Sequence, residues 1–287
     1  MSIISTQELQ LIIENNYIWR NKNVQLLFTT MDSSGPGVKP DIVKQNPEVR
    51  IPNSIFFDFQ HDVVDKSSPY SNTMPSLDEF ETAMNELGIN PDNILIVYDD
   101  FGNFCASRVW FMLKSAGVSD VFVLSGGLPK WLQEERQVTS SCISANKIDS
   151  FVAKPSTDYV FVNADEVLSN IETNTYSLLD ARSPGRFSGQ EQETRVGLRS
   201  GHIPNSVNLH YKNLQQENGE FKSIAEISHL LADIEKENGL IFSCGSGVTA
   251  CILAQAADML DLKPLKVFDG SWSQWGKEQH LPIKTGS

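Results

Sequence analysis

The sequence predicts an α/β protein made of two similar domains, each a mostly parallel sheet flanked by helices. Three observations support this prediction. The chain of 287 residues is long enough for two domains of ordinary size. Short apolar runs alternate with helix-compatible stretches, which is typical of parallel strands buried on both faces. The order of these elements in the first half is repeated in the second half.

The predicted elements follow the same order in each half. Each half opens with a capping-box sequence before a short helix, at Ser5 with Glu8 and at Asn163 with Glu166. A strand, an Ile-Pro-Asn-Ser turn, a glycine-terminated helix, a buried strand, a loop, a second helix and a last strand come next. The expected strands include 24–28, 94–98 and 121–124 in the first half and 177–180, 240–242 and 265–268 in the second. The expected helices after the opening ones include 76–87, 224–236 and 249–260.

A polar segment rich in Ser, Thr and Lys separates the two halves. Such composition between two periodic regions is typical of a linker. We therefore predict an N-terminal domain over 1–140, a linker over 141–157 and a C-terminal domain over 158–287.

Composition and charge exclude several classes of function. A net charge of −13 disfavours binding to nucleic acids or anionic membranes, and it means that an anionic substrate needs a locally basic pocket. No apolar run approaches membrane-spanning length, and the N-terminus lacks the basic and apolar regions of a secretory signal. The four cysteines show neither disulfide nor zinc spacing. We therefore expect a cytoplasmic protein without metal or cofactor.

The segment 241–250, Ile-Phe-Ser-Cys-Gly-Ser-Gly-Val-Thr-Ala, is the most informative part of the chain. It predicts a strand, a tight loop and a helix, with Cys244 at the carboxyl end of the strand. The glycines allow the backbone N–H groups to point inward, and the helix adds the positive end of its dipole. This environment favours a thiolate nucleophile. The alternative is a buried structural cysteine, but Gly-Ser-Gly is a poor filler for a core.

The loop Cys-Gly-Ser-Gly-Val-Thr-Ala at 244–250 resembles the active-site loop of the rhodanese superfamily, in particular of its two-domain 3-mercaptopyruvate sulfurtransferases. The resemblance extends over nearly the whole chain and implies tandem rhodanese-like domains. Its other matching motifs are 68–70, 108–110 and 126–131 in the first half and 180–187, 201–208 and 267–276 in the second.

The resemblance implies a sulfurtransferase that needs no cofactor. It would move a sulfane sulfur from 3-mercaptopyruvate, through a Cys244 persulfide, to cyanide or to an acceptor thiol such as that of a thioredoxin-like protein. We expect a monomer. Two alternatives stay open at this point: thiosulfate as the donor, and a persulfide carrier without turnover. A phosphatase is disfavoured, because the phosphate-binding arginine of that loop would fall at Ala250 or Cys251.

The resemblance also implies a set of site residues. Arg186 and Arg195 match the arginines that hold the donor's carboxylate, and a guanidinium fork fits that planar group. They could instead be ordinary surface arginines, since Arg182 and Arg199 make the stretch basic in any case. Ser246 would donate a hydrogen bond or relay a proton, unless it is only a turn residue. The expected substrate-binding loop comprises Gly245, Gly247, Val248 and Thr249, and the Thr249 hydroxyl is also expected to cap the following helix.

Several other residues are expected to be structural. The loop of the first half, 98–104, is acidic and bulkier, so we predict that this domain is inactive. Cys105, at the start of the next helix, is expected to pack in the core rather than react. The same expectation applies to Cys251, His202, Trp272 and Trp275.

Two positions depart from the family pattern. The aspartate and histidine that relay protons to the loop serine in relatives are replaced by Gln60 and Asn72. An amide cannot carry a proton at accessible pH, so another group or water would have to act, and His61 is one candidate.

Overall fold

The computed structural model describes residues 2–32, 48–193, 195–235 and 237–286. Its two sheets, with helices between their strands, confirm the predicted α/β fold class. The chain divides into two compact units. Unit 1 comprises Met1–Lys66, Pro75–Ser156 and Gln216–Phe221, and unit 2 comprises Ser67–Met74, Thr157–Gln215 and Lys222–Ser287. Each unit thus includes one short segment from the other half of the sequence. The domain boundaries given above stay a prediction.

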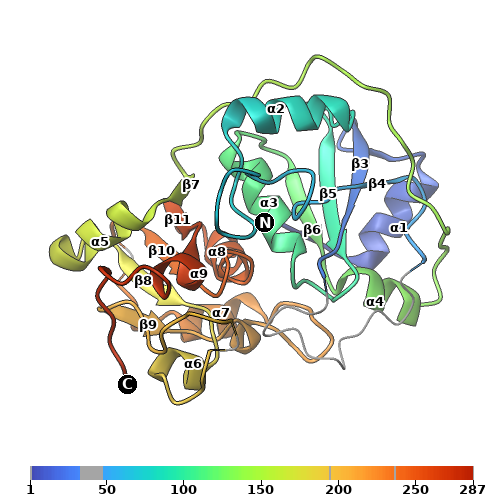
Figure 1. The fold of residues 1–287 in the computed structure, drawn as a ribbon. Coiled ribbons are helices and arrows are strands. Elements are labelled where there is room, and N and C mark those ends of the chain that lie inside the picture. The colour runs from blue at the N-terminus through green and yellow to red at the C-terminus, as the bar shows by residue number, and fades with distance from the viewer. Residues whose placement is uncertain (1, 33–47, 194, 236, 287) are drawn as a thin grey trace. The chain divides into compact units, whose positions relative to one another are not determined.

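Unit 1 contains a sheet with strand order β1-β6-β5-β3-β2, in which β4 also pairs with β3 (Figure 1). All its ladders are parallel except that of β2 with β3. The strands are β1 (Ile3–Ile4), β2 (Ile18–Trp19), β3 (Lys22–Thr29), β4 (Ser54–Phe56), β5 (Ile94–Asp99) and β6 (Val121–Leu124). The helices are α1 (Thr6–Glu14), α2 (Leu77–Glu86), α3 (Ala106–Ser115) and α4 (Gly127–Gln133).

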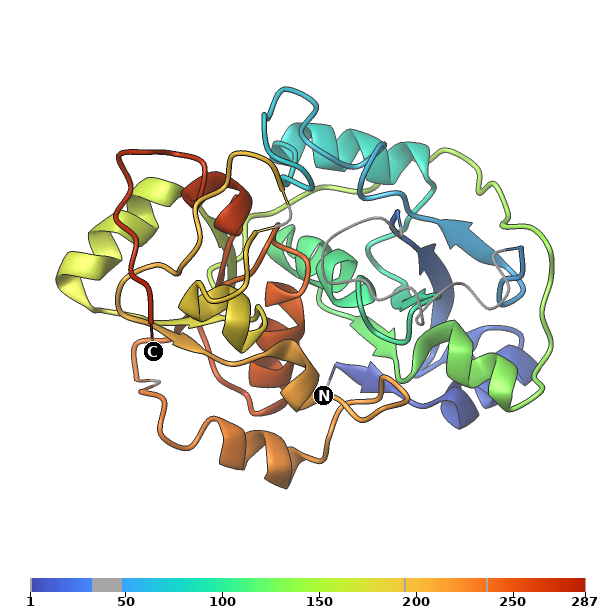
Figure 2. The same ribbon diagram turned by 60° about the horizontal axis from the view of Figure 1, so that its bottom comes forward.

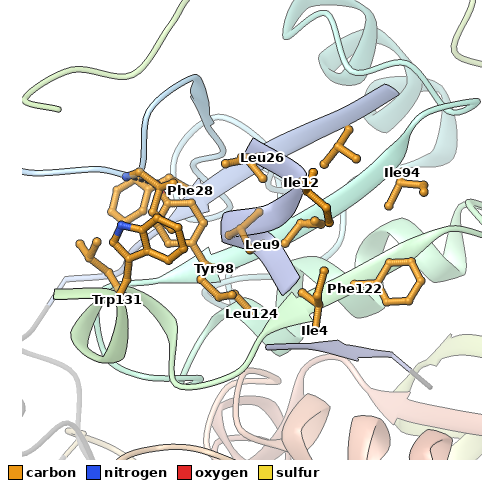
Figure 3. Close-up of a cluster of buried hydrophobic side chains, with 14 residues drawn as sticks. Ile4, Leu9, Ile12, Leu26, Phe28, Ile94, Tyr98, Phe122, Leu124 and Trp131 are labelled. Carbon is orange, nitrogen blue, oxygen red and sulfur yellow. Dashed lines mark hydrogen bonds between the residues drawn. The ribbon is translucent and has the colours of Figure 1, made fainter. Parts of the chain in front are cut away.

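One face of this sheet forms a hydrophobic core with α1 and α4 (Figure 3). Alternate residues of the central strands, such as Phe28 and Tyr98, point to that face, as the period of two along a strand requires. Leu9 of α1 and Trp131 of α4 pack against them. The helix α3 contacts β5 and β6.

Unit 2 contains a five-stranded sheet with the order β7-β11-β10-β8-β9, and all its ladders are parallel. The strands are β7 (Tyr159–Val162), β8 (Ser177–Asp180), β9 (Ser206–Asn208), β10 (Leu240–Ser243) and β11 (Leu265–Phe268). The helices are α5 (Ala164–Thr173), α6 (Pro184–Ser188), the 3₁₀ helix η2 (Tyr211–Leu214), α7 (Ile224–Leu230), α8 (Ala250–Met259) and α9 (Ser271–Trp275).

The helices α5 and α8 lie on opposite sides of the strands of unit 2 (Figures 1 and 2). The α5 side holds a core in which Val167 meets Trp272 and Trp275 of α9. On the other side, α8 packs against β10 and β11. Because β10 is the middle strand of five, it is flanked by β11 on one side and β8 on the other.

Most elements begin and end within two residues of their expected positions. The capping boxes at Ser5 and Asn163 are both formed. The helix expected over 224–236 is wrong in length, because α7 ends at Leu230 and turns follow. Its expected last residue, Lys236, lies outside the described residues. Within the described ranges, no helix is both long and apolar enough to cross a membrane.

Candidate active site

Cys244 directly follows β10, at the carboxyl edge of the unit 2 sheet. All four residues of β10 are buried, so the strand is held on both faces. The carbonyl of Ser243 accepts the N–H of Ala181 at 2.9 Å, which joins this edge to the end of β8. Cys244 itself is only 2% exposed. The position of Cys244 is therefore set by a strand that is buried along its whole length.

The start of α9 fixes the backbone on the other side of Cys244. The N–H of Cys244 donates to the Ser271 hydroxyl at 3.1 Å. The N–H of Trp272 donates to the Cys244 carbonyl at 3.0 Å, and that of Ser273 to the Gly245 carbonyl at 2.9 Å. These bonds satisfy polar groups that would otherwise be buried without a partner.

The rest of the loop turns sharply into α8. Gly247 has a φ of +75°, a left-handed conformation that a side chain would strain. Val248 is buried, and Thr249 occupies the N-cap position of α8. The expectation that the Thr249 hydroxyl caps this helix is wrong, because its side chain makes no capping bond. The physical reason is its helical backbone, with φ −72° and ψ −16°, whereas a side-chain cap requires extended geometry.

Arg186 and Arg195 both face the loop at Gly245. A Cβ built on Gly245 would lie 3.5 Å from Arg186 Nη2 and 3.5 Å from Arg195 Nη1. Arg195 Nη1 donates to the Gly245 carbonyl at 3.0 Å. The alternative of two ordinary surface arginines is therefore disfavoured, since both guanidinium groups flank the residue after Cys244.

Glu193 lies between two of the arginines. Its Oε1 accepts from Arg182 Nη1 at 3.0 Å and from Arg186 Nε at 3.2 Å. Its Oε2 accepts from Arg186 Nη2 at 2.8 Å. Arg182 also binds Asp180 through Nε and Nη2, and donates to the Gly201 carbonyl. A chain of alternating charges thus runs from the end of β8 to the loop.

Burial and neighbouring charges shift the pKa of two of these arginines. Burial lowers the pKa of the Arg195 guanidinium; the charge of Cys244 opposes this shift, and that of Arg186 adds to it. Burial alone would also lower the pKa of Arg182, but the charges of Asp180 and Glu193 outweigh it and raise that pKa overall. Both groups are therefore cationic at neutral pH.

Asn72 contacts Ser246. Its Nδ2 donates to the Ser246 Oγ at 3.2 Å and lies 3.4 Å from the Ser246 carbonyl oxygen. Asn72 has a φ of +65°, a conformation that asparagine tolerates better than most residues. The segment that carries it is anchored within unit 2 by the bond from Met74 N–H to Asp269 at 2.7 Å. The residue at the expected relay position thus contacts the loop serine.

The other two residues of the expected relay belong to unit 1. Gln60 accepts the N–H of Asp32 at 2.8 Å. The His61 ring pairs with Asp58, at 3.0 Å between Nδ1 and Oδ2, and this hydrogen bond raises the pKa of the imidazole.

The loop between β5 and α3 of unit 1 corresponds to the Cys244 loop of unit 2, and it surrounds the carboxylate of Asp99. Asp99, which is 0% exposed, accepts five backbone N–H groups of the loop at 2.7 to 3.1 Å. The donors are Phe101, Asn103, Phe104, Cys105 and Ala106. Ala106 begins α3 seven residues after Asp99, just as Ala250 begins α8 seven residues after Ser243. A loop of this length can therefore direct several N–H groups at one anion.

The two cysteines next to these loops, Cys105 and Cys251, are buried. Burial, with the charges of Asp99 and Asp100, raises the pKa of the Cys105 thiol well above its ordinary value. Cys251 is 0% exposed, and its Sγ donates to the Gly247 carbonyl at 3.3 Å. The expectation that both pack in the interior is confirmed.

Four further residues of unit 2 are structural. Trp272 and Trp275 belong to the hydrophobic core. The His202 ring stacks on Phe187 with centroids 3.8 Å apart, and its Nδ1 lies 2.8 Å from the Phe187 carbonyl. The Arg199 guanidinium donates to backbone carbonyls at and beyond the end of α9, including that of Trp275 at 2.9 Å. No cluster of potential metal ligands occurs among the residues that the structure describes.

Comparison with known proteins agrees with this architecture. A family model for the rhodanese-like domain matches residues 46–134 and again 163–278. The chain belongs to the rhodanese-like family. The 3-mercaptopyruvate sulfurtransferase of Escherichia coli K12 is 34% identical over 263 residues, which cover 91% of this chain and 92% of the relative. The thiosulfate sulfurtransferase of Rattus norvegicus is 37% identical over 238 residues, covering 81% of this chain and 79% of the relative.

Solved structures of the family give the same fold. The crystal structure of SseA from Escherichia coli, a 3-mercaptopyruvate sulfotransferase, superposes with a TM-score of 0.79 at 31% identity and covers 96% of this chain and 100% of its own. The Tum1 protein of Saccharomyces cerevisiae gives a TM-score of 0.83 at 28% identity, with 99% and 98% coverage. The relatives named for these two donors have similar identity to this rhodanese-like chain, at 34% and 37%. Sequence identity therefore does not select the donor, and the residues of the site have to be considered.

Three residues of the site were not predicted from the sequence. Glu193 and Asp180 position the arginines, and Ser271 binds the Cys244 backbone. The only signal for Glu193 was an acidic residue between two arginines in a basic stretch.

Proposed function

We propose that this chain is a sulfurtransferase that takes a sulfane sulfur from 3-mercaptopyruvate and carries it as a Cys244 persulfide. The observation that carries the proposal is the pair of guanidinium groups at Gly245, next to a cysteine at the carboxyl edge of the sheet. Arg186 and Arg195 bind the donor's carboxylate through charge-assisted hydrogen bonds, which directs the donor's sulfur toward Cys244.

The first half-reaction is a displacement at sulfur. The Cys244 thiolate attacks the donor's sulfur, an S–S bond forms, and the C–S bond breaks. The electron pair of that C–S bond leaves with carbon as the enolate of pyruvate, which takes up one proton. Ser246 supplies this proton from its hydroxyl and recovers one from solvent. Because Asn72 Nδ2 donates to the Ser246 Oγ, the hydroxyl proton is directed elsewhere and can serve the donor.

The second half-reaction returns the cysteine to its thiolate form. An acceptor thiolate, such as that of a thioredoxin-like protein, attacks the outer sulfur of the persulfide, and the Cys244 thiolate leaves. The loop N–H groups stabilise negative charge on sulfur in both steps. Unit 1 supports this role of the loop, since its own loop directs five N–H groups at Asp99. Gly245, Gly247, Val248 and Thr249 form the wall of the donor site.

Unit 1 serves a structural role in this proposal. Its loop already holds the Asp99 carboxylate, so a second anion has no place there, and the Cys105 thiol is disfavoured as a thiolate. We further propose a monomer located in the cytoplasm that binds neither nucleic acid nor membranes. The four cysteines show no disulfide spacing in the sequence, which supports a reducing compartment.

Steady-state turnover with cyanide as the acceptor tests the choice of donor. We expect kcat/KM to be higher with 3-mercaptopyruvate than with thiosulfate, because the positions after Cys244 are the neutral Gly245 and Ser246. A higher value with thiosulfate would assign the chain to the alternative donor. No turnover with either donor would indicate a persulfide carrier instead.

A further inference from the structure

Glu193 is a fully buried carboxylate beside the donor site. Its side chain is 1% exposed, and both of its oxygens are engaged by guanidinium groups. A buried carboxylate costs free energy unless it is paired, so the two arginines hold it in its charged form. It reaches Arg186 through two bonds to Nε and Nη2, which leaves Nη1 for another partner.

The charges of this cluster do not balance. Asp180 and Glu193 contribute two carboxylates, and Arg182, Arg186 and Arg195 contribute three guanidinium groups. The Arg182 side chain is 0% exposed, and its guanidinium donates to Asp180, Glu193 and the Gly201 carbonyl. The cluster therefore presents one net positive charge at the loop, although two guanidinium groups face it.

This balance distinguishes sulfur donors by charge. 3-Mercaptopyruvate carries one carboxylate, whereas thiosulfate is a dianion. The side chains around the loop contribute a net charge of +1, which becomes zero once the Cys244 thiolate is counted, so the partly buried site disfavours a dianion more strongly than a monoanion.

We propose that Glu193 is a positioning and specificity-determining residue: it fixes the Arg186 guanidinium and limits the donor site to one positive charge, so that monoanionic donors are favoured over dianionic ones. This inference rests on the proposed sulfurtransferase function. It adds a residue that does not touch the donor but acts through Arg186.

The substitution Glu193→Gln tests the charge effect. Glutamine keeps the size of the side chain and one acceptor oxygen, while the donor site gains one unit of positive charge. We expect the ratio of kcat/KM for thiosulfate to that for 3-mercaptopyruvate to rise at least about tenfold. The matched control is Glu191→Gln, which removes an exposed carboxylate of the same segment that accepts from Ser183 and not from the arginines. The control should leave the ratio unchanged.

Anion binding separates this inference from the proposed function. The Cys244→Ser protein, which cannot turn over, is titrated with pyruvate as the monoanion and sulfate as the dianion. Adding Glu193→Gln should tighten the binding of sulfate relative to pyruvate by a similar factor. If wild-type protein fails to use 3-mercaptopyruvate but this shift occurs, the proposed function fails and the charge inference stands.

The inference would be overturned if Glu193→Gln changed neither the ratio of kcat/KM for the two donors nor the preference for sulfate over pyruvate. It would also be overturned if Glu193→Gln kept its thermal stability but lost the same fraction of kcat/KM on both donors. If Glu193→Gln does not fold, Glu193→Asp serves instead. It keeps the charge on a shorter side chain, so it should raise KM for 3-mercaptopyruvate while the donor preference persists. A gain of thiosulfate preference in Glu193→Asp would contradict the role of charge.

Discussion

Replacing Asp99 by asparagine should open the loop of unit 1. Asp99 Oδ1 accepts from Phe101 and Asn103, and Oδ2 accepts from Phe104, Cys105 and Ala106. An asparagine can place its oxygen at the position with three donors, but its NH₂ group then faces the other two N–H groups. Each buried donor left without an acceptor costs about 1 to 3 kcal/mol, and the remaining bonds lose their charge assistance. We expect a destabilisation of about 3 to 5 kcal/mol.

Alkylation of the Cys105 thiol under native conditions measures this opening. Cys105 is 0% exposed and donates its own N–H to Asp99, so it reacts only when the loop opens. A loss of about 3 kcal/mol corresponds to a labelling rate that is higher by about a hundredfold. Peptide mass spectrometry distinguishes Cys105 from the other thiols. The control is Asp100→Asn, which removes the other carboxylate that raises the pKa of the Cys105 thiol. Asp100 accepts from the Thr30 hydroxyl at 2.8 Å, and the labelling rate of Asp100→Asn should increase far less than that of Asp99→Asn.

Equal labelling rates for Asp99→Asn, Asp100→Asn and wild type would refute this reasoning. They would show that the loop keeps its shape without an anion. Unit 1 would then give no support for an anion-binding role of the matching loop in unit 2.

Three other expectations concern unit 2. Arg186→Ala and Arg195→Ala should each lower kcat/KM for 3-mercaptopyruvate, by an amount equivalent to about 2 to 3 kcal/mol of transition-state free energy. The loss should be smaller for a donor without a carboxylate. Equal losses on all donors would indicate a folding role. Ser246→Ala should slow the first half-reaction by about tenfold in single-turnover measurements. Asn72→His should change the rate of this half-reaction little. A large gain in rate from Asn72→His would show that a histidine relay is needed. Burial lowers the pKa of His202 below 6.5, so the folded state favours its neutral form. The free energy of unfolding should therefore decrease as the pH falls below 6.5. The same decrease in a His202→Gln variant would show that it does not come from His202.

The sequence predicted the strands well because each is a short apolar run whose burial does not depend on details of packing. β6, β8 and β11 occur at the expected residues, and Cys244 follows β10 as expected. Local patterns were less decisive for helix ends. The charged stretch after Leu230 looked helical, yet the chain turns there, because tertiary packing outweighs weak helix propensity.

The charge network could not be predicted from local sequence. Glu193 lies in an irregular polar segment, where an acidic side chain would ordinarily be solvated, and only the fold brings it between Arg182 and Arg186. The contact of Asn72 with Ser246 joins residues 174 positions apart, and nothing in either segment indicates it without the family resemblance. The same holds for Glu220, which comes from the second half of the sequence but pairs with Lys130 in unit 1.

The claim that Cys244 carries the transferred sulfur is tested most directly by intact-mass measurement after exposure to 3-mercaptopyruvate. Wild-type protein should gain the mass of one sulfur atom and lose it again on addition of cyanide. Cys105→Ser and Cys251→Ser should behave in the same way, because the Cys105 thiol is disfavoured as a thiolate and the Cys251 Sγ donates to the Gly247 carbonyl. Cys244→Ser should gain no sulfur and show no turnover. A Cys244→Ser protein that still gains a sulfur and turns over normally would contradict the assignment of Cys244 as the sulfur carrier.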